Sequence, residues 1–78
     1  MTNLEKYTKV FTDTFSISAE QTVGLEYQAI PEWDSVGHMG LIAELEDAFD
    51  IMFDTDDIID FSSFEKGKEI LGKYGVEI

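Results

Sequence analysis

The sequence predicts an all-α fold: a small antiparallel bundle of three main helices plus one short helix, with a long loop between helices one and two. Two observations lead to this class. Apolar residues recur at helical spacing in three separate stretches. Gly24 and the only proline, Pro31, fall between the first two stretches, where no period is sustained. At 78 residues the chain is expected to form one domain, residues 1–78.

The first helix is expected to begin at Asn3, as its N-cap, and to end near residues 15–17. Its apolar residues follow a helical period: Leu4, Tyr7, Phe11 and Phe15. Residues 16–34 are then interpreted as a connection, in which Pro31 favours extended geometry in the residue before it. A loop this long in so small a domain requires a reason. We expect its apolar residues to hold it against the helices: Ile17, Val23, Leu25, Tyr27, Ile30 and Trp33.

The second helix is expected over residues 35–50, because its side chains sort onto two faces at about 100° per residue. One face is the predicted core stripe: His38, Leu41, Ile42, Leu45, Ala48 and Phe49. The opposite face is mildly apolar near the start of the helix and acidic further along: Val36, Met39, Gly40, Ala43, Glu46, Asp47 and Asp50. We expect this second face to lie at the surface.

Two shorter helical pieces follow. Thr55 is expected to cap a brief helix over residues 56–60 whose apolar side chains turn inward: Ile58, Ile59 and Phe61. Ser62 and the glutamate three residues later have the spacing of a capping box, so the last helix should start there and run to about Tyr74. Gly67 inside that helix costs about 1 kcal/mol relative to alanine. Close approach of another helix is the expected compensation.

The strongest compositional feature is a net charge of −12, from 17 acidic and 5 basic residues. Phosphate backbones and anionic membrane surfaces would be repelled, so binding to nucleic acids or lipid surfaces is not expected. Two explanations remain open: the charge steers basic protein partners, or it keeps a small protein soluble. There is no cysteine, no apolar run of the roughly 20 residues that span a membrane, and no secretory leader pattern, so a cytoplasmic location is expected.

The segment IPEWDSVGHMG, residues 30–40, holds the only proline, tryptophan and histidine, with Ser35 directly after Asp34 at its centre. The simplest interpretation is helix capping, because both residue types satisfy N–H groups at helix starts. Capping leaves the apolar Val36 and Met39 beside the serine unexplained. A serine at a helix N-terminus also suits a phosphate ester, since the free N–H groups and the helix dipole favour negative charge.

Two further interpretations have weaker support. Ser35 and His38 could belong to a hydrolase site, but the histidine lies on the core side of the helix and the G-x-S-x-G turn is absent. A lone histidine on a core stripe more often packs than catalyses. Asp54, Asp56 and Glu65 match positions 1, 3 and 12 of a calcium loop, but isoleucines stand at positions 5 and 6. We therefore expect no catalytic residues and no dedicated metal site.

The stretch DSVGHMGLIAELEDAFDIMFDTDDIIDF, residues 34–61, resembles the acyl carrier proteins. The shared elements are the Asp-Ser pair followed by an aliphatic residue, the spacing of Leu41, Ile42 and Leu45, and the run LEDAFDI, which is similar to the family's Leu-Glu-acid-x-Phe pattern. The acid-rich FDTDDI follows where the family places its short third helix. In length and helix order the resemblance covers the whole chain.

The resemblance implies a carrier. Ser35, preceded by Asp34, would hold a 4′-phosphopantetheine arm added from coenzyme A by a phosphopantetheinyl transferase, and the thiol of the arm would bind an acyl or aminoacyl group as a thioester. The chain would be a non-catalytic monomer that presents this cargo to loading and condensing enzymes of fatty-acid, polyketide or related biosynthesis. The implied partner contacts are apolar beside the serine, at Val36 and Met39, and acidic at Glu46 and Asp47, which would meet basic patches. Ala43 and Asp50 complete the implied partner-binding face. The implied core positions that also line space for an acyl chain are Leu41, Ile42, Leu45 and Phe49.

The chain departs from the family pattern at three positions of the second helix. Fatty-acid members of the family usually have acids where this chain has Gly37 and Gly40, and a small residue where it has His38. These differences favour a specialised carrier, of secondary metabolism, surface-polymer assembly or aminoacyl transfer, over the fatty-acid carrier. The alternative belongs to a different class: a small acidic helical adaptor that binds basic proteins without being modified.

Overall fold

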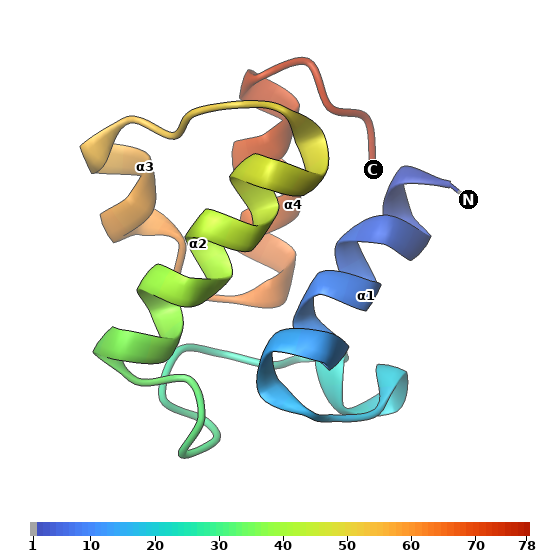
Figure 1. Ribbon diagram of the computed structural model, residues 1–78, viewed down its shortest axis with the longest axis vertical. Helices are drawn as coiled ribbons and strands as arrows, with labels where there is room; N and C mark the ends of the chain where they lie inside the picture. The colour runs from blue at the N-terminus through green and yellow to red at the C-terminus, as the bar shows by residue number, and fades with distance from the viewer. Residues whose placement is uncertain (1) are drawn as a thin grey trace.

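The computed structural model describes residues 2–78. Helices dominate these residues, and no strand is present among them; the bounds are α1 (Asn3–Phe15), the 3-10 helix η1 (Ala19–Thr22), α2 (Ser35–Phe49), α3 (Thr55–Asp60) and α4 (Phe64–Lys73). Figure 1 shows α1 running opposite to α2 and α4, with the short α3 beside the middle of the bundle. The predicted all-α bundle of three main helices plus one short helix is confirmed.

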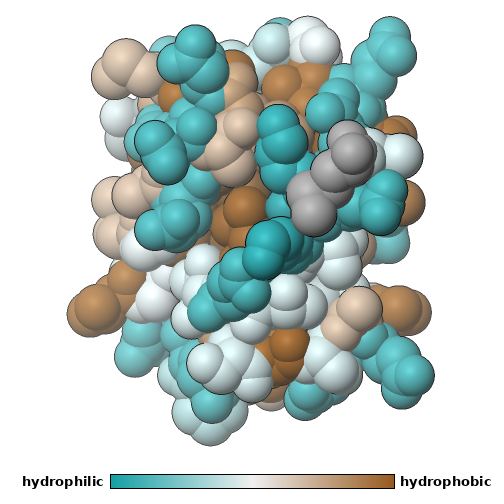
Figure 2. Space-filling view, turned by 45° about the vertical axis from the view of Figure 1, so that its right-hand side comes forward, coloured by the Kyte–Doolittle hydropathy of each residue, from teal (hydrophilic) through white to brown (hydrophobic). Residues whose placement is uncertain are grey.

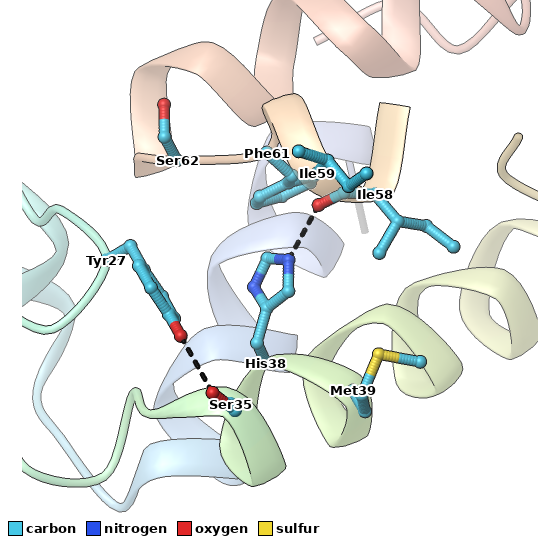
Figure 3. A pocket seen from close by; sticks show the side chains of 8 residues that line it. All are labelled: Tyr27, Ser35, His38, Met39, Ile58, Ile59, Phe61 and Ser62. Atoms are coloured by element: carbon cyan, nitrogen blue, oxygen red, sulfur yellow. Dashed lines mark hydrogen bonds between the residues drawn. The ribbon is translucent and has the colours of Figure 1, made fainter. Parts of the chain in front are cut away.

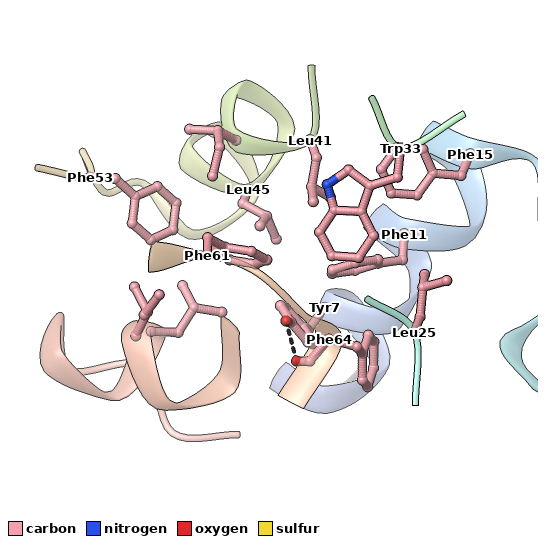
Figure 4. Packing of buried hydrophobic residues seen from close by; sticks show 13 residues of the cluster. Tyr7, Phe11, Phe15, Leu25, Trp33, Leu41, Leu45, Phe53, Phe61 and Phe64 are labelled. Atoms are coloured by element: carbon pink, nitrogen blue, oxygen red, sulfur yellow. Dashed lines mark hydrogen bonds between the residues drawn. The ribbon is translucent and has the colours of Figure 1, made fainter. Parts of the chain in front are cut away.

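An aromatic cluster fills the core, and Phe11 of α1 lies at its centre (Figure 4). The Phe11 ring packs edge-on against Trp33 from the loop at 5.5 Å and against Phe64 of α4 at 4.9 Å, measured between ring centroids. Edge-to-face pairs of this kind add stability beyond the area they bury. The loop and two helices are therefore joined around one side chain of α1.

The start of α1 differs from the prediction by one residue. Thr2 is the N-cap rather than Asn3: its hydroxyl accepts the N–H of Glu5 at 3.1 Å, and the Glu5 carboxylate accepts the N–H of Thr2 at 3.0 Å. This reciprocal pair is a capping box. The Asn3 amide instead donates to the carbonyl oxygen of Glu77 at 3.0 Å, so the two ends of the described chain lie together (Figure 1).

The N-caps predicted for α3 and α4 are also wrong by one residue. Asp54 precedes α3, and Thr55 is the first helical residue rather than the cap; the Asp54 side chain makes no capping bond. Ser63, not Ser62, caps α4 by accepting the N–H of Lys66 at 2.9 Å. Several Ser, Thr and Asp residues stand side by side here, so composition alone does not decide which of them adopts the extended cap geometry.

Gly67 allows α4 to approach α1 and the segment that precedes α4. A Cβ at this position would overlap the Tyr7 hydroxyl oxygen and the Phe61 ring. The Tyr7 hydroxyl is buried there and donates to the carbonyl oxygen of Phe64 at 2.6 Å. The predicted compensation for this helical glycine is confirmed. Helix α4 ends at Lys73, one residue before the predicted Tyr74.

The long connection, residues 16–34, is fastened at several points. It contains η1, and its Leu25 and Trp33 side chains are buried in the core. Its backbone pairs with the start of α4: Tyr27 N–H donates to the carbonyl oxygen of Ser62 at 2.8 Å, and Phe64 N–H donates to that of Leu25 at 2.9 Å. The expectation that apolar residues hold this loop against the helices is confirmed for five residues, the buried Leu25 and Trp33 and the partly buried Ile17, Tyr27 and Ile30. It is wrong for Val23, which is 80% exposed.

Hydrophilic residues cover most of the face seen in Figure 2, and hydrophobic residues appear between them as separate patches. Within residues 2–78, every helix is too short or too polar to cross a bilayer. These residues also contain no buried side-chain nitrogen or oxygen without a hydrogen-bond partner. The polar groups of the core are thus matched by the fold itself.

Candidate functional site

The candidate site is centred on Ser35, the first residue of α2. The preceding Asp34 is the N-cap: its carboxylate accepts the N–H of Gly37 at 2.8 Å, and its carbonyl oxygen accepts the N–H of His38 at 2.8 Å. Capping is therefore performed by the aspartate, and the serine hydroxyl takes no part in it. The exposed Ser35 Oγ lies 3.1 Å from the hydroxyl oxygen of Tyr27 instead.

The end of the loop packs against the first turn of α2. Trp33 is fully buried. Its backbone N–H donates to the carbonyl oxygen of Ile30 at 3.1 Å, and its backbone carbonyl accepts the N–H of Gln28 at 3.0 Å. A Cβ on Gly37 would overlap the carbonyl oxygen of Glu32, so this close approach requires glycine. The packing explains why position 37 holds a glycine and not an acid.

His38 connects the loop, α2 and α3 through its two ring nitrogens. Since the indole of Trp33 can only donate, its bond of 2.9 Å makes Nδ1 of His38 an acceptor. Nε2 therefore holds the ring proton and donates to the carbonyl oxygen of Ile58 at 2.8 Å (Figure 3). Both nitrogens have structural partners and neither is bonded to Ser35. The histidine has the packing role expected of it.

A pocket of about 380 Å³ opens beside Ser35, between α2 and the α3 segment (Figure 3). Its lining residues are Tyr27, Ser35, His38, Met39, Ile58, Ile59, Phe61 and Ser62. Isoleucine and phenylalanine side chains form much of the wall, with the Tyr27 and Ser35 hydroxyls near one another on one side. Because four segments meet here, spacing along the sequence did not indicate the pocket.

The apolar residues of α2 and α3 differ from the prediction in two respects: which of them line the pocket, and which are buried. Leu41, Ile42 and Leu45 are buried in the core as expected, but neither they nor the half-buried Phe49 line this pocket. Ile59 was expected to turn inward and is 73% exposed at the pocket wall. In a helix of six residues only one narrow stripe can face the core, and Asp57 and Ile58 occupy it.

The pocket wall formed by α3 is held to α4 by a buried carboxylate. Asp57 is only 4% exposed and accepts hydrogen bonds from Lys73 Nζ and from the Tyr74 hydroxyl, each at 2.5 Å. These bonds, first the one from Lys73 and then the one from Tyr74, lower the pKa of the Asp57 carboxyl. The same pairing raises the pKa of the Lys73 ammonium. No sequence pattern indicates this role for Asp57, because its partners lie 16 and 17 residues further along the chain.

The face of α2 beside Ser35 is open to solvent. Val36 is 82% exposed and Met39 is 55% exposed, and Ala43, Asp47 and Asp50 are exposed further along the helix. Glu46 differs from this group. It is half-buried, and its carboxylate accepts the N–H of Phe53 at 2.9 Å, which ties the end of α2 to the following loop. The expectation that Glu46 is a free surface acid is wrong.

The acid-rich segment before α4 is helical rather than a calcium loop. Residues 55–60 form α3, and Glu65 lies in the first turn of α4. Among residues 2–78, no three carboxylate or imidazole side chains gather closely enough to hold a metal ion.

Comparisons with protein-family models, with curated proteins and with solved structures found no match to this chain.

Proposed function

We propose that this chain is a carrier protein of the acyl-carrier type, with Ser35 as the attachment point of a 4′-phosphopantetheine arm. The observation that supports this most strongly is that Asp34, and not Ser35, caps the start of α2. Asp34 caps the helix through Gly37, so the Ser35 hydroxyl is exposed and unused by the fold's own backbone. A serine kept at this position without a capping role requires another explanation, and covalent modification provides one.

The surroundings of Ser35 suit the phosphodiester of such an arm. The first four N–H groups of an α-helix lack intrahelical acceptors. In α2 the N–H of Gly37 is bonded to the Asp34 side chain, and the N–H of His38 makes the first backbone bond of the helix, to the Asp34 carbonyl oxygen. The N–H groups of Ser35 and Val36 have no acceptor among the described residues. Together with the positive end of the helix dipole, these two N–H groups favour a negatively charged group on Ser35. The arm itself supplies a thiol on which acyl or aminoacyl cargo is held as a thioester.

The exposed face of α2 is the proposed docking surface. Val36 and Met39 provide apolar contacts next to the arm, and Asp47 and Asp50 provide charge for basic patches on transferases and on loading or condensing enzymes. Ala43 lies between the two groups. Glu46 contributes mainly by holding the end of α2, through its bond to Phe53. In this proposal the chain performs no chemistry and is itself the substrate of its partners.

The test is an intact-mass measurement. The apo protein is incubated with coenzyme A and a broad-specificity phosphopantetheinyl transferase, and we expect the mass to rise by one arm. Ser35→Ala should stay unmodified, while Ser62→Ala, which changes another exposed hydroxyl of the same pocket, should accept the arm like the wild type. A wild type that gains no mass, or a Ser35→Ala variant that gains it, would falsify the proposal.

The second candidate is an unmodified acidic adaptor. The net charge of −12 supports it independently of Ser35, because that charge alone attracts basic proteins. The same mass measurement separates the two candidates: an adaptor stays unmodified, and its binding of basic partners is indifferent to Ser35→Ala.

A further inference from the structure

Tyr27 is held firmly in the position from which it reaches Ser35. Its N–H donates to the carbonyl oxygen of Ser62 at 2.8 Å. Its ring packs edge-on against Trp33 at 6.2 Å and against His38 at 5.4 Å, measured between centroids. Trp33 and His38 are in turn hydrogen-bonded to each other. The phenol is thus fixed by backbone and side-chain contacts that involve neither its own hydroxyl nor Ser35.

The hydroxyl of this fixed ring contacts the one side-chain atom that the proposed function modifies. Tyr27 Oη and Ser35 Oγ are 3.1 Å apart, and no other side-chain hydrogen bond to Ser35 is found within residues 2–78 (Figure 3). A serine hydroxyl on a helix otherwise rotates among staggered positions. The bond to Tyr27 selects one of them, on the side of the pocket.

Attachment of the arm decides which residue can donate the hydrogen bond between Tyr27 and Ser35. In the transfer, the bond from Ser35 Oγ to phosphorus forms while a P–O bond of the coenzyme A pyrophosphate breaks; the serine proton passes to a base of the transferase, and adenosine 3′,5′-bisphosphate leaves. The esterified Oγ has no proton to donate. Tyr27 must then be the donor, and the charged phosphodiester oxygens beside Oγ are stronger acceptors than the ester oxygen.

We infer that Tyr27 is a positioning residue for the modification: it orients the Ser35 hydroxyl for transfer and afterwards donates a hydrogen bond to the phosphodiester. This inference rests on the proposed function, because it presupposes that Ser35 accepts the arm. It adds a residue from the loop, outside the Asp-Ser pair and outside α2, to the machinery of the site.

The test compares Tyr27→Phe, which removes only the hydroxyl and keeps the ring on Trp33 and His38, with Ser62→Ala as the matched loss of a second pocket hydroxyl. Transfer of the arm is followed at varied carrier concentration with excess coenzyme A. For Tyr27→Phe we expect kcat to fall about three- to tenfold, the effect of one lost hydrogen bond, with KM for the carrier unchanged. Ser62→Ala should retain the wild-type kcat.

The second readout is the phosphorus NMR spectrum of the modified proteins. The phosphodiester resonance should shift in Tyr27→Phe and stay in place in Ser62→Ala, and unchanged melting temperatures would show that both variants are folded. If the wild type accepts the arm but Tyr27→Phe matches it in kcat and in phosphorus shift, the role of Tyr27 is refuted and the carrier function stands. If the wild type accepts no arm, both proposals fail together.

Discussion

At the scale of single residues, the rare residues around Ser35 have separate tasks. Asp34 caps α2, Trp33 and His38 fasten the loop to α2 and α3, and Tyr27 contacts the serine hydroxyl. The sequence indicated the importance of Ser35 because this hydroxyl stands at a predicted helix start beside apolar residues. It did not indicate Tyr27, because the two positions are eight apart in the sequence, joined by irregular loop, and no periodicity relates them.

Two glycines of α2 provide a matched test of the packing at this site. Gly37→Ala should destabilise the protein by about 1–3 kcal/mol, since its Cβ would overlap the Glu32 carbonyl oxygen and displace the loop. Gly40→Ala should stabilise it by about 0.4–1 kcal/mol, because a Cβ there meets nothing within 4 Å and alanine favours the helix.

Urea unfolding of the two variants and the wild type measures both changes. Equal stability of Gly37→Ala and Gly40→Ala would show that the loop does not press against the first turn of α2. In that case, packing would not explain why this chain has glycine at positions 37 and 40, where the carrier family usually has acids.

At the scale of elements, the helices were predictable and their ends were less so. The apolar period of residues such as Tyr7, Phe11 and Phe15 placed α1, and all three are buried. The caps were wrong by one residue at Asn3, Thr55 and Ser62, where neighbouring polar residues are equally suitable by type. The pocket was not predictable, because its wall depends on how α3 is anchored, and that depends on a carboxylate that pairs across the fold.

The Asp57 anchor of α3 predicts a specific dependence of stability on pH. Its folded-state pKa is lowered by the bonds from Lys73 and Tyr74, so its contribution is fully present above the ordinary aspartate value of about 3.9 and is lost as the pH falls below that value through the lowered one. Because the Lys73 side chain is 63% exposed, solvent screens part of the pairing.

We therefore expect Asp57→Asn to be less stable than the wild type at neutral pH. The gap should narrow below pH about 4, where the Asp57 carboxyl of the unfolded chain binds a proton before that of the folded protein does. Thermal unfolding from pH 7 down to pH about 3 checks this difference, and the subtraction removes the titration of the other acids. A gap that stays constant across this range would mean that the charge of Asp57 is not what anchors α3.

At the scale of the whole molecule, a large negative charge surrounds a small aromatic core. The chain has a net charge of −12, and its exposed hydrophobic residues include Val36 and Met39 beside Ser35. The sequence left two explanations of this charge open, solubility and steering of partners. If the charge serves solubility, all exposed acids should be equivalent; if it steers partners, the acids at the docking surface should affect binding more than the others.

Charge reversal on α2 distinguishes these two explanations. Asp47→Lys should raise the KM of the transferase for the carrier about two- to fivefold without lowering the melting temperature, because Asp47 is exposed and surface ion pairs contribute up to about 1 kcal/mol. Added salt should reduce the difference between variant and wild type. Glu46→Lys is the structural contrast: loss of its bond to Phe53 should lower the melting temperature by about 4–8 °C.

If Asp47→Lys leaves KM unchanged at low salt, the acidity serves solubility alone and the docking face lies elsewhere. If it lowers the melting temperature as Glu46→Lys does, position 47 has a structural task that its exposure does not indicate.

The hydrogen bond between Trp33 and His38 has a practical consequence for anyone who studies this protein. Trp33 is the only tryptophan, it is fully buried, and its indole is bonded to a histidine that also holds α3, while its ring touches the tyrosine that contacts Ser35. The molecule thus contains a single tryptophan, which lies at the junction of the loop, the pocket and the Ser35 hydroxyl. Its emission offers a label-free optical signal from the site, observed against no background from other tryptophans.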